Sequence, residues 1–226
     1  MNEPRMVEVR RKVLKENDLL ARRLSERFES ARVQVISLVS SPGSGKTTLL
    51  ERLLTDLGRE YHVAALVGDL ATENDAARLA RSGAPVKQIT TGTVCHLDAQ
   101  MVEKALAAWA LDNFDFLFIE NVGNLVCPSS FDLGENLRLV LVSTTEGEDK
   151  PLKYPTIFNT ADVAIVTKLD LADAAGFDLE ALTRNIQGVR PGMPILKVST
   201  KAGHGMEELE QFLVSRRAEV EAARAV

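Results

Sequence analysis

Two side chains that bind transition metals stand next to each other in TGTVCHLDAQ, residues 91–100, where they are Cys95 and His96. Both types are scarce, because the 226 residues include 2 cysteines and 3 histidines. The other cysteine, Cys127, lies in the segment ENVGNLVCP. Thiolate and imidazole ligands suit Ni²⁺ or Zn²⁺, and geometry decides between these ions. One chain supplies three ligands, so water or a second copy in a symmetric dimer is expected to complete the site.

A second group of residues is suited to binding phosphate. The segment SSPGSGKTT follows an apolar run and precedes the helical pattern LLERLL. Gly43 and Gly45 let successive backbone N–H groups point at an anion, Lys46 supplies a cation, and Thr47 offers a hydroxyl to Mg²⁺. The sequence departs mildly from the usual pattern G-x-x-x-x-G-K-[ST], because Ser40 stands where the pattern has its first Gly. The predicted nucleotide loop comprises Pro42, Gly43, Ser44, Gly45, Lys46, Thr47 and Thr48.

Two later segments are similar to guanine-binding motifs of GTPases. The segment TKLD resembles N-K-x-D, in which Asp170 would accept the ring N–H and the exocyclic amine of guanine while the Lys168 stem lies along the base. Thr167 replaces the usual Asn, which predicts a weaker base contact or a weaker loop-holding hydrogen bond. Ser199 and Lys201 stand where GTPases have S-A-K. With the phosphate loop and the segment ENVG, these segments form a set of four in the order found in GTPases, which favours GTP over ATP.

The segment ENVG resembles the D-x-x-G segment that senses the γ-phosphate in GTPases. Glu120 is expected to hold Mg²⁺ through water, and the N–H of Gly123 to bind the γ-phosphate. The next residue is Asn124 rather than the Gln that positions water in many GTPases, so slow intrinsic hydrolysis is expected. Cys127 lies four residues beyond Gly123, which favours a metal ligand coupled to nucleotide state over the alternative of a small core residue.

The segment GDLATENDAARL adds two acidic candidates. Asp69 is expected to contact the Mg²⁺ shell, and Asp75 to orient water or close over the nucleotide. The alternative for Asp75 is a first-turn charge that the helix dipole favours. The predicted catalytic residues are therefore Lys46, Asp75 and Gly123.

The pattern of the chain predicts how these groups are positioned. Short apolar runs predict strands at 33–40, 62–68, 86–90, 114–120, 138–143, 162–167 and 194–199, and longer periodic stretches predict helices at 46–58, 73–82, 97–111, 151–159, 177–188 and 205–223. Strands that are apolar throughout are covered on both faces. We therefore predict an α/β fold of the P-loop NTPase type, with a mostly parallel doubly wound sheet and helices on both faces.

Residues 1–32 are predicted to form a helical extension, and residues 33–226 the P-loop GTPase domain. The extension places Val9, Val13, Leu20, Leu24 and Phe28 on one helical face, which predicts packing on the body or on a second subunit. It carries nine basic and six acidic side chains, leaving 18 basic and 26 acidic for the rest. An acidic body argues against nucleic acid as the main partner.

Composition also bears on location. The apolar runs are too short to span a bilayer, and MNEPRMVEVRRK has no apolar signal region. We therefore expect a cytoplasmic protein without a membrane partner, in a compartment where the thiols stay reduced.

Taken in order, SSPGSGKTTLL, GDLATENDA, TGTVCHLDA, ENVGNLVCP, DKPLKYP and TKLDL resemble the HypB family of nickel-insertion GTPases that mature [NiFe] hydrogenase. The resemblance covers about residues 33 to 210. It implies a GTP-dependent homodimer that shares metal through Cys95, His96 and Cys127, and delivery with a partner nickel chaperone to the hydrogenase large subunit. Lys153, in DKPLKYP, is then expected to reach the nucleotide of the neighbouring subunit. MNEPRMVEVRRK has neither the Cys-rich motif nor the His-rich tract of some members.

The sequence thus predicts a GTP-binding and GTP-hydrolysing metallochaperone that needs GTP or GDP, Mg²⁺, and Ni²⁺ or Zn²⁺. Two alternatives remain at this point. One is a P-loop phosphotransferase or kinase that uses ATP. The other is a metal carrier without hydrolysis, in which the nucleotide only supports the fold or the dimer.

Overall fold

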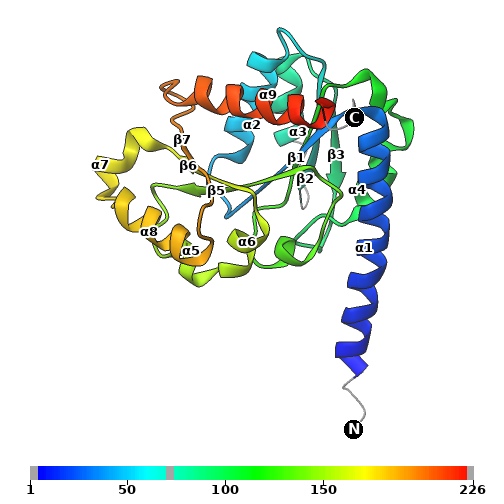
Figure 1. Ribbon diagram of the computed structural model, residues 1–226, viewed down its shortest axis with the longest axis horizontal. Helices are drawn as coiled ribbons and strands as arrows, with labels where there is room; N and C mark the ends of the chain where they lie inside the picture. The colour runs from blue at the N-terminus through cyan, green and yellow to red at the C-terminus, as the bar shows by residue number, and fades with distance from the viewer. Residues whose placement is uncertain (1–4, 70–73, 223–226) are drawn as a thin grey trace.

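The computed structural model describes residues 5–69 and 74–222, and its centre is a seven-stranded sheet (Figure 1). The strands are β1 (Gln34–Ser40), β2 (Val63–Asp69), β3 (Val86–Thr90), β4 (Phe116–Glu120), β5 (Leu137–Ser143), β6 (Val163–Thr167) and β7 (Ile195–Lys197). They lie in the order β3-β2-β4-β1-β5-β6-β7, and all six neighbouring pairs are parallel. The loops that follow β1, β4 and β6 therefore meet at one edge, where such sheets bind ligands.

Every residue of β1, β4, β5 and β6 is buried. Ile36 and Leu38 of β1 face α2 (Lys46–Leu57), α3 (Asn74–Leu79) and α9 (Met206–Ala222). Val35 and Val39 face the other side, which α1 (Arg5–Ala31), α4 (Ala99–Ala105), α6 (Pro155–Thr160) and α8 (Leu179–Val189) cover. Successive side chains of β1 thus pack into hydrophobic cores on opposite faces of the sheet. The prediction of a doubly wound sheet is confirmed.

Two predicted helices differ from the structure. The predicted helix 151–159 is broken into α5 (Lys150–Lys153) and α6, because Pro155 lacks an amide hydrogen and disfavours a helical Tyr154, whose φ and ψ are −127° and 54°. The predicted helix 97–111 begins late, at Ala99, since the Asp98 side chain caps it by accepting from Met101 N. It ends at Ala105 and continues as the 3₁₀ turns η2 (Leu106–Ala108) and η3 (Leu111–Asn113).

The predicted helix 73–82 corresponds to α3 followed by η1 (Ala80–Ser82), while residue 73 lies outside the described residues. Three further short elements complete the fold: η4 (Cys127–Ser130), η5 (Leu169–Leu171) and α7 (Ala172–Ala175). The element η4 carries one of the two cysteines and lies on the connection after β4, and η5 carries Asp170 just after β6. Both connections leave their strands at the ligand-binding edge.

Helix α1 packs on the body through only part of its predicted apolar face. Leu20, Leu24 and Phe28 are buried, but Val9 and Val13 are 55% and 47% exposed. Figure 1 shows the reason, because the first half of the helix extends beyond the globular body. Packing on the body therefore accounts for Leu20, Leu24 and Phe28, while packing of Val9 and Val13 on a second subunit stays a prediction.

Among the helices that the structure describes, none has the length and apolar character needed to cross a membrane.

Candidate functional site

The phosphate loop joins β1 to α2 and has the backbone that an anion site needs. Gly43 and Gly45 have φ angles of 76° and 93°, a region that favours glycine. Lys46 is buried, and its Nζ donates a hydrogen bond to Oγ of Ser40 at 2.8 Å. Burial lowers the pKa of Lys46, while the carboxylates of Glu120, Asp75 and Glu146 oppose that change. The Ser that departs from the usual motif thus holds the lysine in the loop.

A magnesium ion fits beside this loop. Thr47 Oγ1 donates to Oε1 of Glu120 at 2.7 Å, so the two predicted Mg²⁺ groups are neighbours. The other carboxylate oxygen of Glu120 is buried and accepts no hydrogen bond from any described residue. An oxygen without a donor suits a hard cation, which prefers oxygen ligands. Asp69, Asp75 and Gly123 line the same cavity, which has a volume of about 540 Å³.

Burial raises the pKa of Glu120 to about 7, against the opposing effects of Lys46 and of the hydrogen bond from Thr47. In the unfolded chain this carboxyl ionises near its ordinary value of 4.5. As the pH rises from the pKa of Glu120 in the unfolded chain to its pKa in the folded protein, the free energy of unfolding therefore falls. The fall amounts to about 3 kcal/mol. Asp75 raises the same pKa and Arg78 lowers it.

Glu120→Gln is expected to remove that loss in protein free of nucleotide and Mg²⁺. The difference in unfolding free energy between variant and wild type should then favour the variant more at about pH 8 than at about pH 5, by up to ~3 kcal/mol. Urea unfolding at both pH values measures it. A difference that is the same at both values would contradict the assigned pKa. The variant should also bind GTP with little dependence on Mg²⁺.

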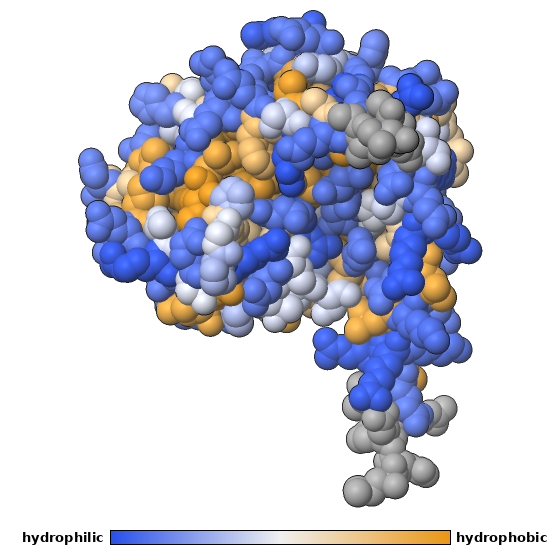
Figure 2. All heavy atoms as spheres, viewed as in Figure 1, coloured by the Kyte–Doolittle hydropathy of each residue, from blue (hydrophilic) through white to orange (hydrophobic). Residues whose placement is uncertain are grey.

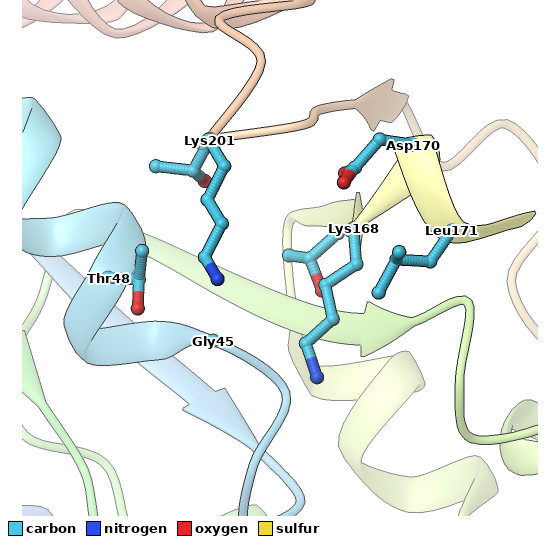
Figure 3. Close-up of a pocket in the computed structure, with 8 residues that line it drawn as sticks. Gly45, Thr48, Lys168, Asp170, Leu171 and Lys201 are labelled. Carbon is cyan, nitrogen blue, oxygen red and sulfur yellow. The ribbon is translucent and has the colours of Figure 1, made fainter.

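The base end of the cleft is a second cavity of about 240 Å³, shown in Figure 3. Lys168 and Lys201 project into it from two different loops, with Asp170 beside them. Ser199 Oγ donates a hydrogen bond to the Asp170 carboxylate and so fixes its orientation. Lys168 adopts a left-handed backbone with φ 57°, and its carbonyl accepts from Thr144 Oγ1 at 2.7 Å. A strained residue held this firmly is typical of a binding site.

Thr167 makes the contact that its replacement of Asn had placed in doubt. Its Oγ1 donates to the carbonyl of Ser44 in the phosphate loop at 2.7 Å. The shorter side chain therefore still joins the base-binding segment to the phosphate loop. Thr48 and Gly45 line both cavities, so the two form one continuous cleft that has room for base and phosphates.

The three predicted soft ligands come together on the same edge of the sheet. One ligand atom from each of Cys95, His96 and Cys127 lies within 4.8 Å of the others, and the two sulfurs are 3.0 Å apart. The His96 ring packs against the Phe131 ring in a tilted arrangement, with centroids 4.0 Å apart. Within the described part of the chain, Nδ1 of His96 is buried without a hydrogen-bond partner. Two sulfurs and one imidazole nitrogen form a donor set that fits a soft metal cation.

Protonation at this cluster also suits metal binding. Burial lowers the pKa of His96, so the imidazole is neutral near neutral pH and free to coordinate. The hydrogen bond with Cys95, followed by burial, raises the pKa of Cys127. A metal ion must therefore displace the proton of the Cys127 thiol, and binding should release protons.

Several neighbours of the cleft were not singled out from the sequence. Arg78 lines the phosphate end and donates to Glu51 and Thr48. Lys150 Nζ donates to Ser41 Oγ at 3.2 Å, beside the phosphate loop. Lys153 instead lies on the exposed side of α5 and pairs with Asp149 at 2.5 Å. Its predicted reach to a neighbouring nucleotide stays a prediction. Lys150 carries no motif signal beyond its place in DKPLKYP.

A P-loop nucleotide site, a guanine-type base pocket and a parallel doubly wound sheet together define a P-loop GTPase. A family model described as CobW/HypB/UreG, nucleotide-binding domain, matches residues 34–197. The hydrogenase maturation factor HypB of Azotobacter vinelandii is 46% identical over 219 residues, which are 96% of this chain and 72% of the relative. The hydrogenase/urease maturation factor HypB of Helicobacter hepaticus is 43% identical over 217 residues, or 94% of this chain and 89% of the relative.

A solved structure agrees. The crystal structure of HypB from Helicobacter pylori in complex with nickel matches with a TM-score of 0.86 at 42% identity, covering 90% of this chain and 96% of that chain. The chain therefore belongs to the HypB family, as the resemblance of its motifs predicted.

Proposed function

We propose that this chain is a GTP-hydrolysing metallochaperone that carries Ni²⁺ for hydrogenase maturation, with nucleotide state coupled to metal affinity. The observation that carries the proposal is the cluster of Cys95, His96 and Cys127 at the edge of the sheet that also binds phosphate. Cys127 follows the segment of Gly123, which lines the phosphate cavity. The relatives support Ni²⁺ as the carried ion, since the HypB structure from Helicobacter pylori is a complex with nickel. Zn²⁺ is a second cargo that the same donors accept.

In hydrolysis, water attacks the γ-phosphorus and the bond to the β–γ bridging oxygen breaks, giving GDP and phosphate. The ammonium group of Lys46 stabilises the negative charge on the β- and γ-phosphate oxygens, and the N–H of Gly123 donates a hydrogen bond to the γ-phosphate. Thr47 and Glu120 would hold Mg²⁺, Asp69 would contact its shell, and the bound ion would supply positive charge to the phosphates. Asp75 orients the attacking water. The guanine base is read by Asp170, and Lys168 lies along it.

We propose further that the protein acts in the reducing cytoplasm as a homodimer, because three ligands leave one position of a four-coordinate site open. Exposed apolar side chains support a partner surface at the end of the sheet with β6 and β7. Leu152 on α5 is 57% exposed and Leu171 in η5 is 41% exposed, and Figure 2 shows apolar surface over this end of the molecule. A nickel chaperone and the hydrogenase large subunit are the proposed partners.

The coupling is tested by titrating Ni²⁺ into protein loaded with GDP or with a non-hydrolysable GTP analogue. We expect dissociation constants that differ at least about fivefold between the two states. By linkage, Ni²⁺ must change the affinity ratio of the two nucleotides by the same factor. Equal constants in both nucleotide states would remove the coupling, and competition by ATP as strong as by GTP would favour a phosphotransferase.

A further inference from the structure

The segment after β4 is joined to the Cys95–His96 pair by two asparagine side chains. Oδ1 of Asn121 accepts a hydrogen bond from the backbone N–H of Leu97 at 3.0 Å. Nδ2 of Asn124 donates to the backbone carbonyl of Cys95 at 3.3 Å. These two bonds lie on either side of His96. The ligand pair is therefore fastened at both ends to the residues that flank Gly123.

The same segment is in contact with the phosphate loop. A Cβ added to Gly123 would lie 3.0 Å from Cα of Pro42, so the two backbones already touch. The N–H of Asn121 donates to the carbonyl of Leu38 in β1 at 3.0 Å, just before the strand enters that loop. Displacement of Gly123 by a γ-phosphate would therefore be passed on by the residues beside it.

Both polar ends of the Asn124 side chain are in use. Nδ2 donates to Cys95, while Oδ1 accepts from the N–H of Val126 at 2.8 Å. The side chain also interacts with Cys127. An amide with its donor and its acceptor engaged in this way is poorly placed to orient a water molecule. This matters because Asn124 occupies the position where many GTPases have a water-positioning Gln.

We propose that Asn121 and Asn124 are positioning residues that move Cys95 and His96 together with the γ-phosphate-sensing segment, and so set the metal affinity in each nucleotide state. The inference rests on the proposed function and names the side chains that transmit it. Asn121 fixes the side of the pair that leads into α4, and Asn124 joins Cys95 to the turn that carries Cys127. All three ligands thus respond to one segment.

The test compares Asn124→Ala with Asn124→Asp and a control. The aspartate keeps the acceptor for Val126 but loses the donor to Cys95. Asn113→Ala, an exposed asparagine in η3 at the opposite edge of the sheet, is the matched control. For each protein we measure the ratio of Ni²⁺ dissociation constants with GDP and with the GTP analogue, the thiolate-to-nickel absorption band in both states, and single-turnover GTP hydrolysis.

In both Asn124 variants we expect the Ni²⁺ dissociation constants of the two nucleotide states to differ by less than about twofold. The thiolate-to-nickel absorption band should then be the same with either nucleotide. The rate of GTP hydrolysis should stay within about threefold of wild type. The control should keep the wild-type ratio. If the variants keep the wild-type ratio of Ni²⁺ dissociation constants, the inference is overturned. If, in addition, hydrolysis falls about 100-fold, Asn124 is a water-positioning residue instead. If wild type itself shows equal constants, the proposed function fails instead.

Discussion

Lys46→Ala is expected to lower the rate of GTP hydrolysis about 100- to 1,000-fold, the loss typical of removing one preorganised charge stabiliser. The lysine is buried at the start of α2, and its Nζ lies at the phosphate loop on Ser40. No solvent cation can take its place with the same geometry, and Arg78, which also lines the cavity, is engaged by Glu51 and Thr48. Phosphate release under single-turnover conditions with saturating GTP measures the change.

The matched control is Lys104→Ala, on the exposed face of α4. It should leave the rate within about twofold of wild type. A Lys46→Ala protein that hydrolyses GTP within about tenfold of wild type would contradict the assigned role. Metal transfer by the same variant decides a further question. Normal transfer without GTP binding would favour a carrier whose nucleotide has no part in delivery.

Cys127→Ser is expected to weaken Ni²⁺ binding about 100-fold or more, because a neutral hydroxyl replaces one of two thiolates among three ligands. The thiolate-to-nickel absorption band should fall accordingly. GTP affinity without metal should stay within about threefold of wild type, since the sulfur lies outside the cleft that holds the nucleotide. Competition with a coloured chelator measures the metal affinity, and fluorescent GDP displacement the nucleotide affinity.

Ser130→Ala in the same 3₁₀ turn is the control for local damage. It should bind Ni²⁺ like wild type. If Cys127→Ser keeps wild-type affinity for the ion, the cysteine is a packing residue, and the coupling assigned to it has no physical basis.

The motifs were predictable from the sequence because their residues are close together along the chain. Four spaced segments in the right order predicted a guanine-nucleotide site, and strands that are apolar throughout predicted the burial of β1 and β4 on both faces. The hydrogen bonds that join distant segments were not predictable, although the meeting of Cys95 with Cys127 was. The hydrogen bond from Thr167 to Ser44 joins residues 123 positions apart, and the bond between Leu97 and Asn121 spans 24. Only folding shows which distant backbone groups these side chains meet.

Errors in the helices have local causes of the same kind. Periodicity across 151–159 is helical, but Pro155 interrupts the hydrogen bonding of the backbone. The apolar stripe of α1 continues past the point where the body ends, so its first valines stay in water. A pattern indicates which face is apolar, but not how far a neighbouring surface extends. Asn124 was singled out as a departure from GTPases, although its partners were visible only in three dimensions.

The 3.0 Å separation of the two sulfurs has a practical side as well. Thiols that close are readily joined by a peroxide-class oxidant, which removes two electrons and two protons and leaves a covalent bridge in place of two donors. A sample kept in air would then hold less cargo than its concentration suggests. Sulfhydryl counts therefore need to accompany every binding stoichiometry, and anaerobic preparation is the condition under which this protein can be compared between laboratories.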